Sequence, residues 1–154
     1  MDLSDILQAE DVLPALQAGS KRQVLQALAA HAADMTGLDE RAIFDVLMQR
    51  ERLGSTGLGG GIAIPHGRFA GIERVMGIFA RLASPVDFDA LDHQPVDIVF
   101  MLMAPESAGA DHLKALARVS RVLRDKALVE KLRATREPNA LYALLTSAQS
   151  SRAA

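Results

Sequence analysis

The chain has 154 residues, no cysteine and a formal net charge of −2 at pH 7. A protein with this charge has no overall attraction to nucleic acid or anionic lipid, and a chain without cysteine has no disulfide, thiolate zinc site or cysteine nucleophile. The N-terminus carries no basic segment leading into an apolar run, and the longest apolar stretch, residues 98–104, is far shorter than the roughly 20 residues of a membrane helix. We therefore expect a cytoplasmic protein with no nucleic-acid partner and no stable membrane insertion.

Two helices are predicted in the first third of the chain. Ser20 and Gln23 form a capping box that opens the first helix, which we expect to end near Gly37. Asp39 can cap the second helix, and Gly54 ends it. Both segments have apolar residues at helical spacing, so each should pack one face against a core.

The middle of the chain predicts strands. Residues 62–65 form a short extended piece, and residues 75–82 are typical of a strand. Residues 96–103 are apolar except for one aspartate, as expected of a strand covered on both faces. Strands and helices do not alternate strictly, so we predict a single α/β domain over residues 1–154, with a mixed parallel and antiparallel sheet flanked by helices on both faces.

Three helices are predicted after the last strand. A long helix runs to Arg124, followed by shorter helices near residues 127–133 and 138–146, and residues 147–154 are expected to form a frayed tail. The residues predicted on the inner face of the long helix are Leu113, Leu116, Ala117, Ser120 and Leu123.

A glycine-rich segment separates the helical first third from the strands. Seven of the eleven glycines lie in residues 54–71. Such a segment leaves backbone N–H groups uncovered and permits positive φ, so it can surround an anion. It does not match a P-loop, which requires Lys and then Ser or Thr after the second spaced glycine. It does not match a dinucleotide fingerprint either, because Ile62 stands where a glycine is required.

This segment ends on His66, which lies between Pro65 and Gly67. Proline fixes its own φ and glycine leaves space beside the ring, which suits an imidazole presented at the surface. A neutral imidazole nitrogen can attack phosphorus, and an ordinary pKa of about 6.5 keeps much of the ring neutral at cytoplasmic pH. A turn histidine is the alternative; the dense glycine run and the preceding Ser55 and Thr56 favour a functional one.

Three blocks of sequence resemble one known family. Residues 50–57, which read Arg-Glu-Arg-Leu-Gly-Ser-Thr-Gly, and residues 62–67, Ile-Ala-Ile-Pro-His-Gly, are similar to the signature of the fructose/mannitol/nitrogen-regulatory IIA family of the bacterial phosphotransferase system. Residues 88–97 resemble the run into the central strand of that family, and residues 105–125 resemble its next helix. The similarity covers most of the chain and is greatest to the nitrogen-regulatory branch.

The resemblance implies a role for individual residues. His66 corresponds to the phosphorylated histidine, attacking through Nε2, His112 to its partner histidine, and Arg50 to the positive residue beside the phosphate. Ser55, Thr56 and Gly57 are the candidate phosphate-binding residues of the loop.

These implied roles agree with the chemistry of the side chains. The planar guanidinium of Arg50 can bind two phosphate oxygens, although a basic residue near a helix C-terminus also has a simple electrostatic explanation. His112 falls in the first turn of the helix that follows the core strand, where an imidazolium is disfavoured, so it should be a neutral donor. The alternative for His112 is a half-buried histidine bonded to backbone.

The resemblance also implies the partners. A histidine phosphocarrier protein, HPr-like or NPr-like, would donate the phosphoryl group, and downstream regulatory proteins would respond to the phosphorylation state. The chain would act as a phosphotransferase component without a small-molecule substrate, a metal or a nucleotide cofactor.

Several alternatives remain open from the sequence. One is a sugar-branch IIA that passes phosphate to a IIB domain, and another is a regulatory binding module without phosphotransfer. A small hydrolase or phosphatase using His66 and His112 is a third. A metal site formed by His93, His112 and nearby aspartates is a fourth, although no pair of these residues has the usual ligand spacing.

Overall fold

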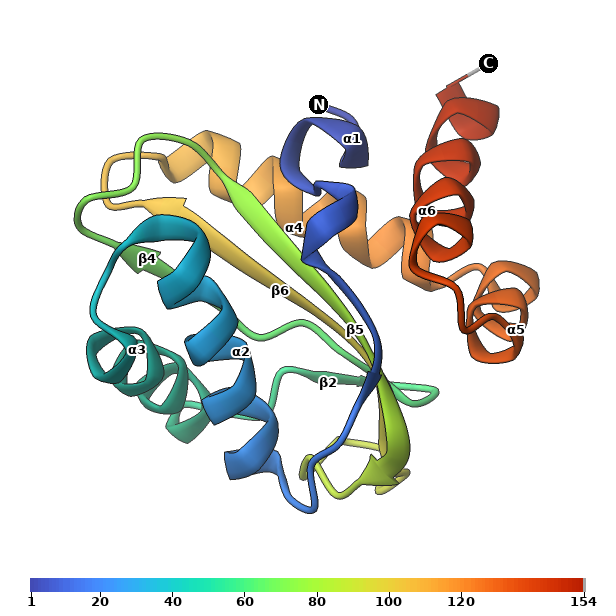
Figure 1. Cartoon of the computed structure of the whole chain (residues 1–154), viewed down its shortest axis with the longest axis horizontal. Helices are drawn as coiled ribbons and strands as arrows, with labels where there is room; N and C mark the ends of the chain where they lie inside the picture. The colour runs from blue at the N-terminus through green and yellow to red at the C-terminus, as the bar shows by residue number, and fades with distance from the viewer. Residues whose placement is uncertain (154) are drawn as a thin grey trace.

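A mixed six-stranded sheet forms the centre of the computed structural model, which describes residues 1–153 and the side chains up to residue 147 (Figure 1). Strand β6 is antiparallel to β5 and parallel to β3 and β4, β1 is parallel to β5, and β2 is antiparallel to β3. The prediction of a mixed sheet is confirmed. The strands are β1 (Val12–Leu16), β2 (Gly57–Gly59), β3 (Ile62–Ala63), β4 (His66–Phe69), β5 (Met76–Val86) and β6 (Val96–Pro105).

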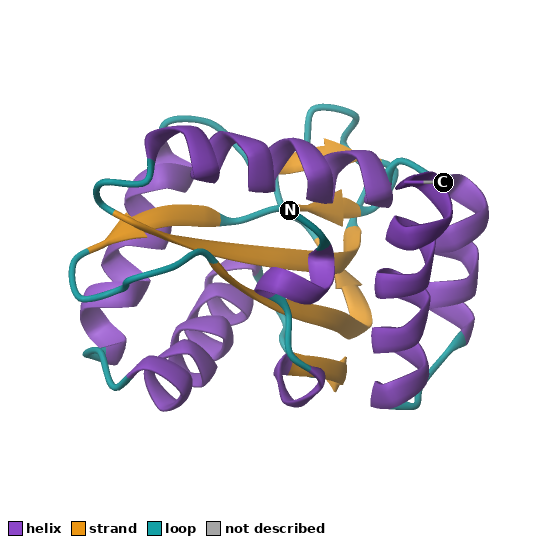
Figure 2. Ribbon diagram, turned by 90° about the horizontal axis from the view of Figure 1, so that it is seen from above, coloured by secondary structure: helices purple, strands orange, loops and turns teal. Residues whose placement is uncertain are grey.

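Helices cover both faces of this sheet (Figure 2). On one face, Phe100 and Leu102 of β6 pack in a core shared with α1, α4, α5 and α6; on the other, Met101 and Met103 pack in a core shared with α2 and α3. Alternate side chains of β6 therefore serve opposite cores, as the apolar run predicts. The helices are α1 (Leu3–Ile6), α2 (Lys21–Thr36), α3 (Glu40–Arg52), α4 (Gly109–Leu123), α5 (Lys126–Ala134) and α6 (Pro138–Ala153), with a 3-10 turn at Ala9–Asp11.

The capping residues set the ends of the first two long helices as predicted. The Ser20 hydroxyl accepts from the backbone N–H of Gln23, while the Gln23 side chain accepts from Gly19 instead of closing the box on Ser20. Gly37 ends α2 with a φ of 78°, a left-handed conformation that glycine adopts without steric cost. The Asp39 side chain caps α3.

The glycine-rich segment contains more sheet than the sequence predicts. Strand β4 begins at His66, which pairs in parallel register with Leu102, so this histidine opens a strand and does not lie in a turn. Strand β1 was also not predicted. It contains Pro14, which cannot donate to a ladder, and it lies at the edge of the sheet, where proline is tolerated.

The predicted inner face of helix α4 is correct in part. Leu123 is buried and Leu116 packs against the core, but Leu113 is 65% exposed and Ala117 is exposed. His112, Ala115 and Val119, which were not predicted on this face, are buried. The buried face is centred on the stripe that contains His112, Ala115 and Val119, next to the predicted one.

The C-terminal helix is longer than predicted. Helix α6 is described to Ala153, beyond the expected end near residue 146. The predicted frayed tail of residues 147–154 ends outside the described residues, and its side chains from residue 148 onward lie outside them too. No helix within residues 1–153 combines the length and apolar character needed to cross a bilayer.

The close contact of β4 with α3 gives a first prediction, since a Cβ added at Gly67 would lie 2.6 Å from Val46 Cγ1. We expect Gly67→Ala to lower the free energy of unfolding by about 1–3 kcal/mol through overpacking, measured by urea denaturation. Gly109→Ala is the matched control, because its Cβ would meet no atom within 4 Å. Equal stability of Gly67→Ala and the wild type would contradict this close packing.

Candidate functional site

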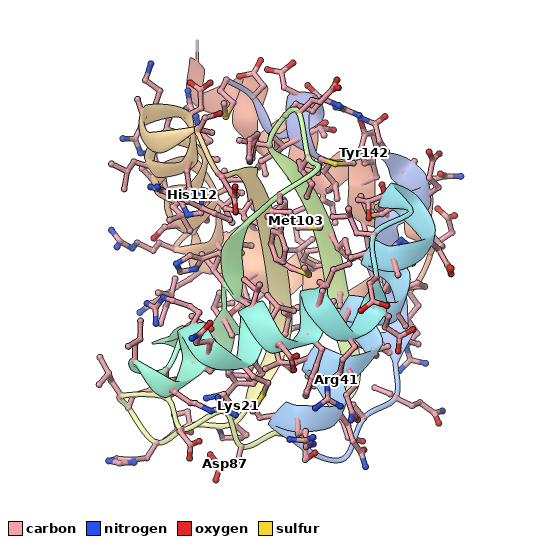
Figure 3. All side chains as sticks on the ribbon, turned by 90° about the vertical axis from the view of Figure 1, so that its left-hand side faces the viewer. Lys21, Arg41, Asp87, Met103, His112 and Tyr142 are labelled. Carbon is pink, nitrogen blue, oxygen red and sulfur yellow. The ribbon has the colours of Figure 1, made fainter. Side chains whose placement is uncertain are left out.

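Three side chains from distant parts of the sequence meet at the carboxyl end of β6. His66 opens β4, Arg50 lies in the last turn of α3, and His112 lies in the first turn of α4. Figure 3 labels His112 on α4 and Met103 on β6. Met103 pairs with Gly67, the residue after His66. This is where open α/β sheets commonly bind ligands, beyond the carboxyl ends of their strands.

The hydrogen bonds of His66 distinguish its two ring nitrogens. Nδ1 lies 2.8 Å from the carbonyl oxygen of Ile64, which can only accept, so Nδ1 carries the proton. Arg50 Nε lies 3.3 Å from Nε2 and can only donate, so Nε2 keeps its lone pair. Arg50 also donates from Nη1 to the carbonyl of Gly54 at 2.9 Å, which fixes the guanidinium at a second point. The ring is half-buried, with a nucleophilic nitrogen beside a permanent cation.

His112 approaches the ring of His66 by its edge. The two ring centroids are 5.5 Å apart with an interplanar angle of 63°. His112 is buried, with 7% of its surface exposed, while the next residue, Leu113, faces solvent. The structure therefore brings together all three residues that the resemblance assigns to catalysis.

The environment keeps both histidines in the neutral form. Burial lowers the pKa of His66 below its ordinary value, and the charge of Arg50 lowers it further, against opposing effects of the Ile64 carbonyl and the Glu51 carboxylate. Burial also lowers the pKa of His112, followed by the effects of His66 and Arg68. At neutral pH, each ring therefore offers one N–H donor and one lone pair.

The three predicted phosphate-binding residues make hydrogen bonds within the protein. The Ser55 hydroxyl donates to the carbonyl of Phe88 at 2.6 Å and accepts from the N–H of Gly57 at 3.0 Å. Both the N–H and the hydroxyl of Thr56 donate to the carboxylate of Glu51. These donors stabilise the loop in the unphosphorylated chain, and direct binding of phosphate by them stays a prediction.

Two residues in contact with this loop were not identified from the sequence. Glu51 is buried, and its carboxylate lies 2.8 Å from Nζ of Lys21 at the start of α2. A glutamate in the last turn of a helix normally faces solvent, and Lys21 is thirty residues away in the sequence, so spacing gives no signal for the pair.

The other two histidines lie away from this site. His93 is an exposed loop residue with a φ of 60°, and His31 pairs with Asp11 at 2.9 Å. Within the described residues, no three His, Asp or Glu side chains are grouped so that they could hold a metal ion. The metal alternative therefore has no ligand set in that part of the chain.

A comparison with known families agrees with this arrangement. The family described as "Phosphoenolpyruvate-dependent sugar phosphotransferase system, EIIA 2" matches residues 5–148. The chain belongs to the EIIA type 2 family. As a family, these proteins are phosphotransfer components.

Relatives of this EIIA type 2 chain include proteins of both branches. The "Nitrogen regulatory protein" of Bradyrhizobium diazoefficiens is 56% identical over 145 residues, covering 94% of this chain and 95% of the relative. The "PTS system fructose-specific EIIA component" of Haloferax volcanii is 36% identical over 132 residues, covering 85% and 86%. The crystal structure of nitrogen regulatory protein IIA-Ntr from Neisseria meningitidis superposes with a TM-score of 0.89 at 35% identity, covering 94% of this chain and 99% of that one.

The position of Arg50 predicts how the pKa of His66 responds to mutation. Arg50→Gln removes a positive charge that lowers this pKa, so the pKa should rise, as followed by ¹⁵N imidazole NMR during a pH titration. Arg41→Gln is the matched control, because Arg41 lies on the same helix but pairs with Asp45 at 3.1 Å on the exposed face. An unchanged or lower His66 pKa in Arg50→Gln would contradict the proximity of the two groups.

Proposed function

We propose that this EIIA type 2 chain is a phosphohistidine carrier that accepts a phosphoryl group on Nε2 of His66 from a histidine phosphocarrier protein. The observation that carries the proposal is the pair of hydrogen bonds on the ring: Nδ1 donates to Ile64, and Nε2 accepts from Arg50. Together they leave the nucleophilic lone pair on the nitrogen beside the cation. The carrier would act in the cytoplasm, where we expect its donor.

The transfer step exchanges one nitrogen–phosphorus bond for another. The Nε2 lone pair of His66 attacks the phosphorus, and the donor's N–P bond breaks with its electron pair returning to the donor imidazole. The proton on Nδ1 stays on that nitrogen, hydrogen-bonded to the Ile64 carbonyl, so no proton has to leave Nε2 first. Little further covalent chemistry is needed, and catalysis depends on alignment and charge stabilisation.

Arg50 and His112 supply that charge stabilisation. When Nε2 loses its lone pair to phosphorus, Arg50 can turn its donors from the ring to the phosphoryl oxygens, where charge-assisted hydrogen bonds are strongest. His112, kept neutral by burial, presents an N–H donor without placing a second full charge in the site. The loop of Ser55, Thr56 and Gly57 directly follows Gly54, whose carbonyl is the second acceptor for Arg50.

The relatives favour a regulatory role for this carrier. The Bradyrhizobium protein, at 56% identity, is a nitrogen regulatory protein, as is the Neisseria structure. We propose that the phosphorylation state of His66 controls binding of this chain to target proteins. The fructose-specific relative at 36% identity keeps the sugar branch as the second candidate, in which a IIB domain receives the phosphate.

The carrier mechanism predicts a covalent mass change. The wild type, incubated with phosphoenolpyruvate, enzyme I and a histidine phosphocarrier protein, should gain one acid-labile phosphate by intact mass spectrometry, because the N–P bond is labile in acid. His66→Ala should gain none, and His93→Ala, which changes an exposed loop histidine, should behave as the wild type. Absence of any gain in the wild type with several competent donors would contradict the carrier function and favour a phosphorylation-independent binding module.

A second measurement separates the two branches. The purified phosphorylated chain is mixed with a fructose-type IIB domain, and the phosphate on each protein is followed by mass. The regulatory proposal expects the phosphate to remain on His66 over a time in which a sugar-branch EIIA transfers it completely. Complete transfer to the IIB domain at the rate of that positive control would instead support the sugar branch.

A further inference from the structure

We propose that Glu51 is a positioning residue for phosphoryl transfer. Through its bonds to Thr56, Glu51 fixes the positions of both Arg50 and the imidazole of His66. This inference rests on the carrier function proposed above and names residues that support its reacting groups. Neither Glu51 nor Lys21 touches the phosphoryl group in this proposal. They act through the backbone of the loop.

The carboxylate of Glu51 is buried and fully engaged. Its side chain is 4% exposed, and it binds Nζ of Lys21 at 2.8 Å, the N–H of Thr56 at 3.1 Å and the hydroxyl of Thr56. A buried ion pair is costly to desolvate, and apolar residues of similar volume often replace one without loss of stability. Fold stability alone therefore does not explain this arrangement.

The first consequence of the Glu51–Thr56 bonds concerns Arg50. The side-chain bonds close the turn of residues 51–56, and the N–H of Gly54 donates to the backbone carbonyl of Glu51 at 3.1 Å inside that turn. The carbonyl of Gly54 is in turn the acceptor for Nη1 of Arg50. The carboxylate therefore sets where Gly54 lies, and Gly54 sets where the guanidinium meets His66.

The second consequence concerns the imidazole itself. The carbonyl of Thr56 accepts from the N–H of Ile64 at 3.0 Å, and the carbonyl of Ile64 accepts from Nδ1 of His66 at 2.8 Å. Successive hydrogen bonds thus connect Glu51 to Thr56, Thr56 to Ile64 and Ile64 to His66, and they fix the position of the Ile64 carbonyl. That carbonyl favours the tautomer with a free lone pair on Nε2.

Lys21 closes the network on the outer side. Its ammonium lies between the Glu51 carboxylate and the carbonyl of Phe88, to which it donates at 3.3 Å. The same carbonyl accepts from the Ser55 hydroxyl. Lys21 thus balances the buried charge and links the loop to residues 87–93.

A matched control exists elsewhere in the chain. Asp11 is also a buried carboxylate, with 7% of its side chain exposed and an ion pair to His31 at 2.9 Å. It belongs to the 3-10 turn before β1, outside the loop of residues 54–57. Removing its charge tests the general effect of losing a buried ion pair.

The experiment compares phosphoryl acceptance in four variants. At saturating phosphorylated donor, Glu51→Gln and Thr56→Val should lower the rate of phosphoryl acceptance by about 10- to 100-fold, as expected for a small misplacement of reacting groups. The donor concentration that gives half the maximal rate should change by less than about twofold. Thr56→Ser keeps the hydroxyl and should retain a rate within about threefold of the wild type. Asp11→Asn should keep the wild-type rate even where its melting temperature falls.

A second readout requires no phosphoryl transfer. By ¹⁵N NMR of the unphosphorylated protein, Glu51→Gln should increase amide exchange at Thr56 and Ile64 and the population of the Nε2–H tautomer of His66. His112 and the nearby Arg68, two other titratable groups around this site, are unchanged in this variant.

The outcomes separate the two proposals. A folded Glu51→Gln protein with wild-type acceptance and unchanged His66 ring-nitrogen shifts would overturn the positioning role while the carrier function stands. A wild type that accepts no phosphate from any donor would remove the carrier function. In that case the tautomer of His66 and the amide exchange at Thr56 and Ile64 in Glu51→Gln decide alone whether Glu51 positions the ring.

Discussion

The hydrogen bond from Nδ1 of His66 to the carbonyl of Ile64 determines which nitrogen of the ring is nucleophilic. An imidazole without a fixed acceptor would exchange between its two tautomers, and in one of them the proton on Nε2 would face an incoming phosphorus. Here the acceptor is a backbone carbonyl two residues earlier in the chain, so the choice of nitrogen depends on the local path of the backbone. Arg50 and His112 therefore act on a ring in which that hydrogen bond has already determined the nucleophilic nitrogen.

The sheet gives this local path its rigidity. His66 pairs with Leu102 of β6, and β6 is buried between two cores, so the reactive residue begins at a well-anchored strand (Figure 1). Arg50 and His112 come from helices that pack on opposite faces of the same sheet. The site thus joins the two layers at one end of β6, and each layer contributes one side chain to the histidine.

The sequence predicts the parts of the fold that depend on local chemistry. Ser20, Gly37 and Asp39 define helix ends by their own hydrogen bonds and dihedral angles, and the apolar run of β6 requires cover on both faces. It does not predict β4, because a glycine-rich segment becomes a strand only when β6 offers a partner. The buried face of α4 was predicted only in part: Leu116 and Leu123 pack inward as expected, whereas the burial of His112 beside His66 depends on how the helix packs on the sheet.

The candidate site divides in the same way. His66, His112 and Arg50 follow from resemblance, since no spacing rule brings residues 50, 66 and 112 together. The bonds of Glu51 with Lys21 and Thr56 follow neither from the resemblance nor from residue spacing, because the burial of this carboxylate depends on the whole arrangement of α2, α3 and the loop. Charged side chains that bind backbone groups of a loop are therefore the hardest part of this site to predict from sequence alone.

The hydrogen bond from Arg50 to Nε2 has one further consequence. Nitrogen has a single lone pair at that position, so it can hold the guanidinium or a phosphorus atom but never both. Modification of His66 would therefore release an arginine that is also tied to Gly54, next to Leu53, a leucine with 84% of its surface in solvent. The chemical state of one ring nitrogen is in this way connected through hydrogen bonds to the outer surface of the loop, where another protein could sense it.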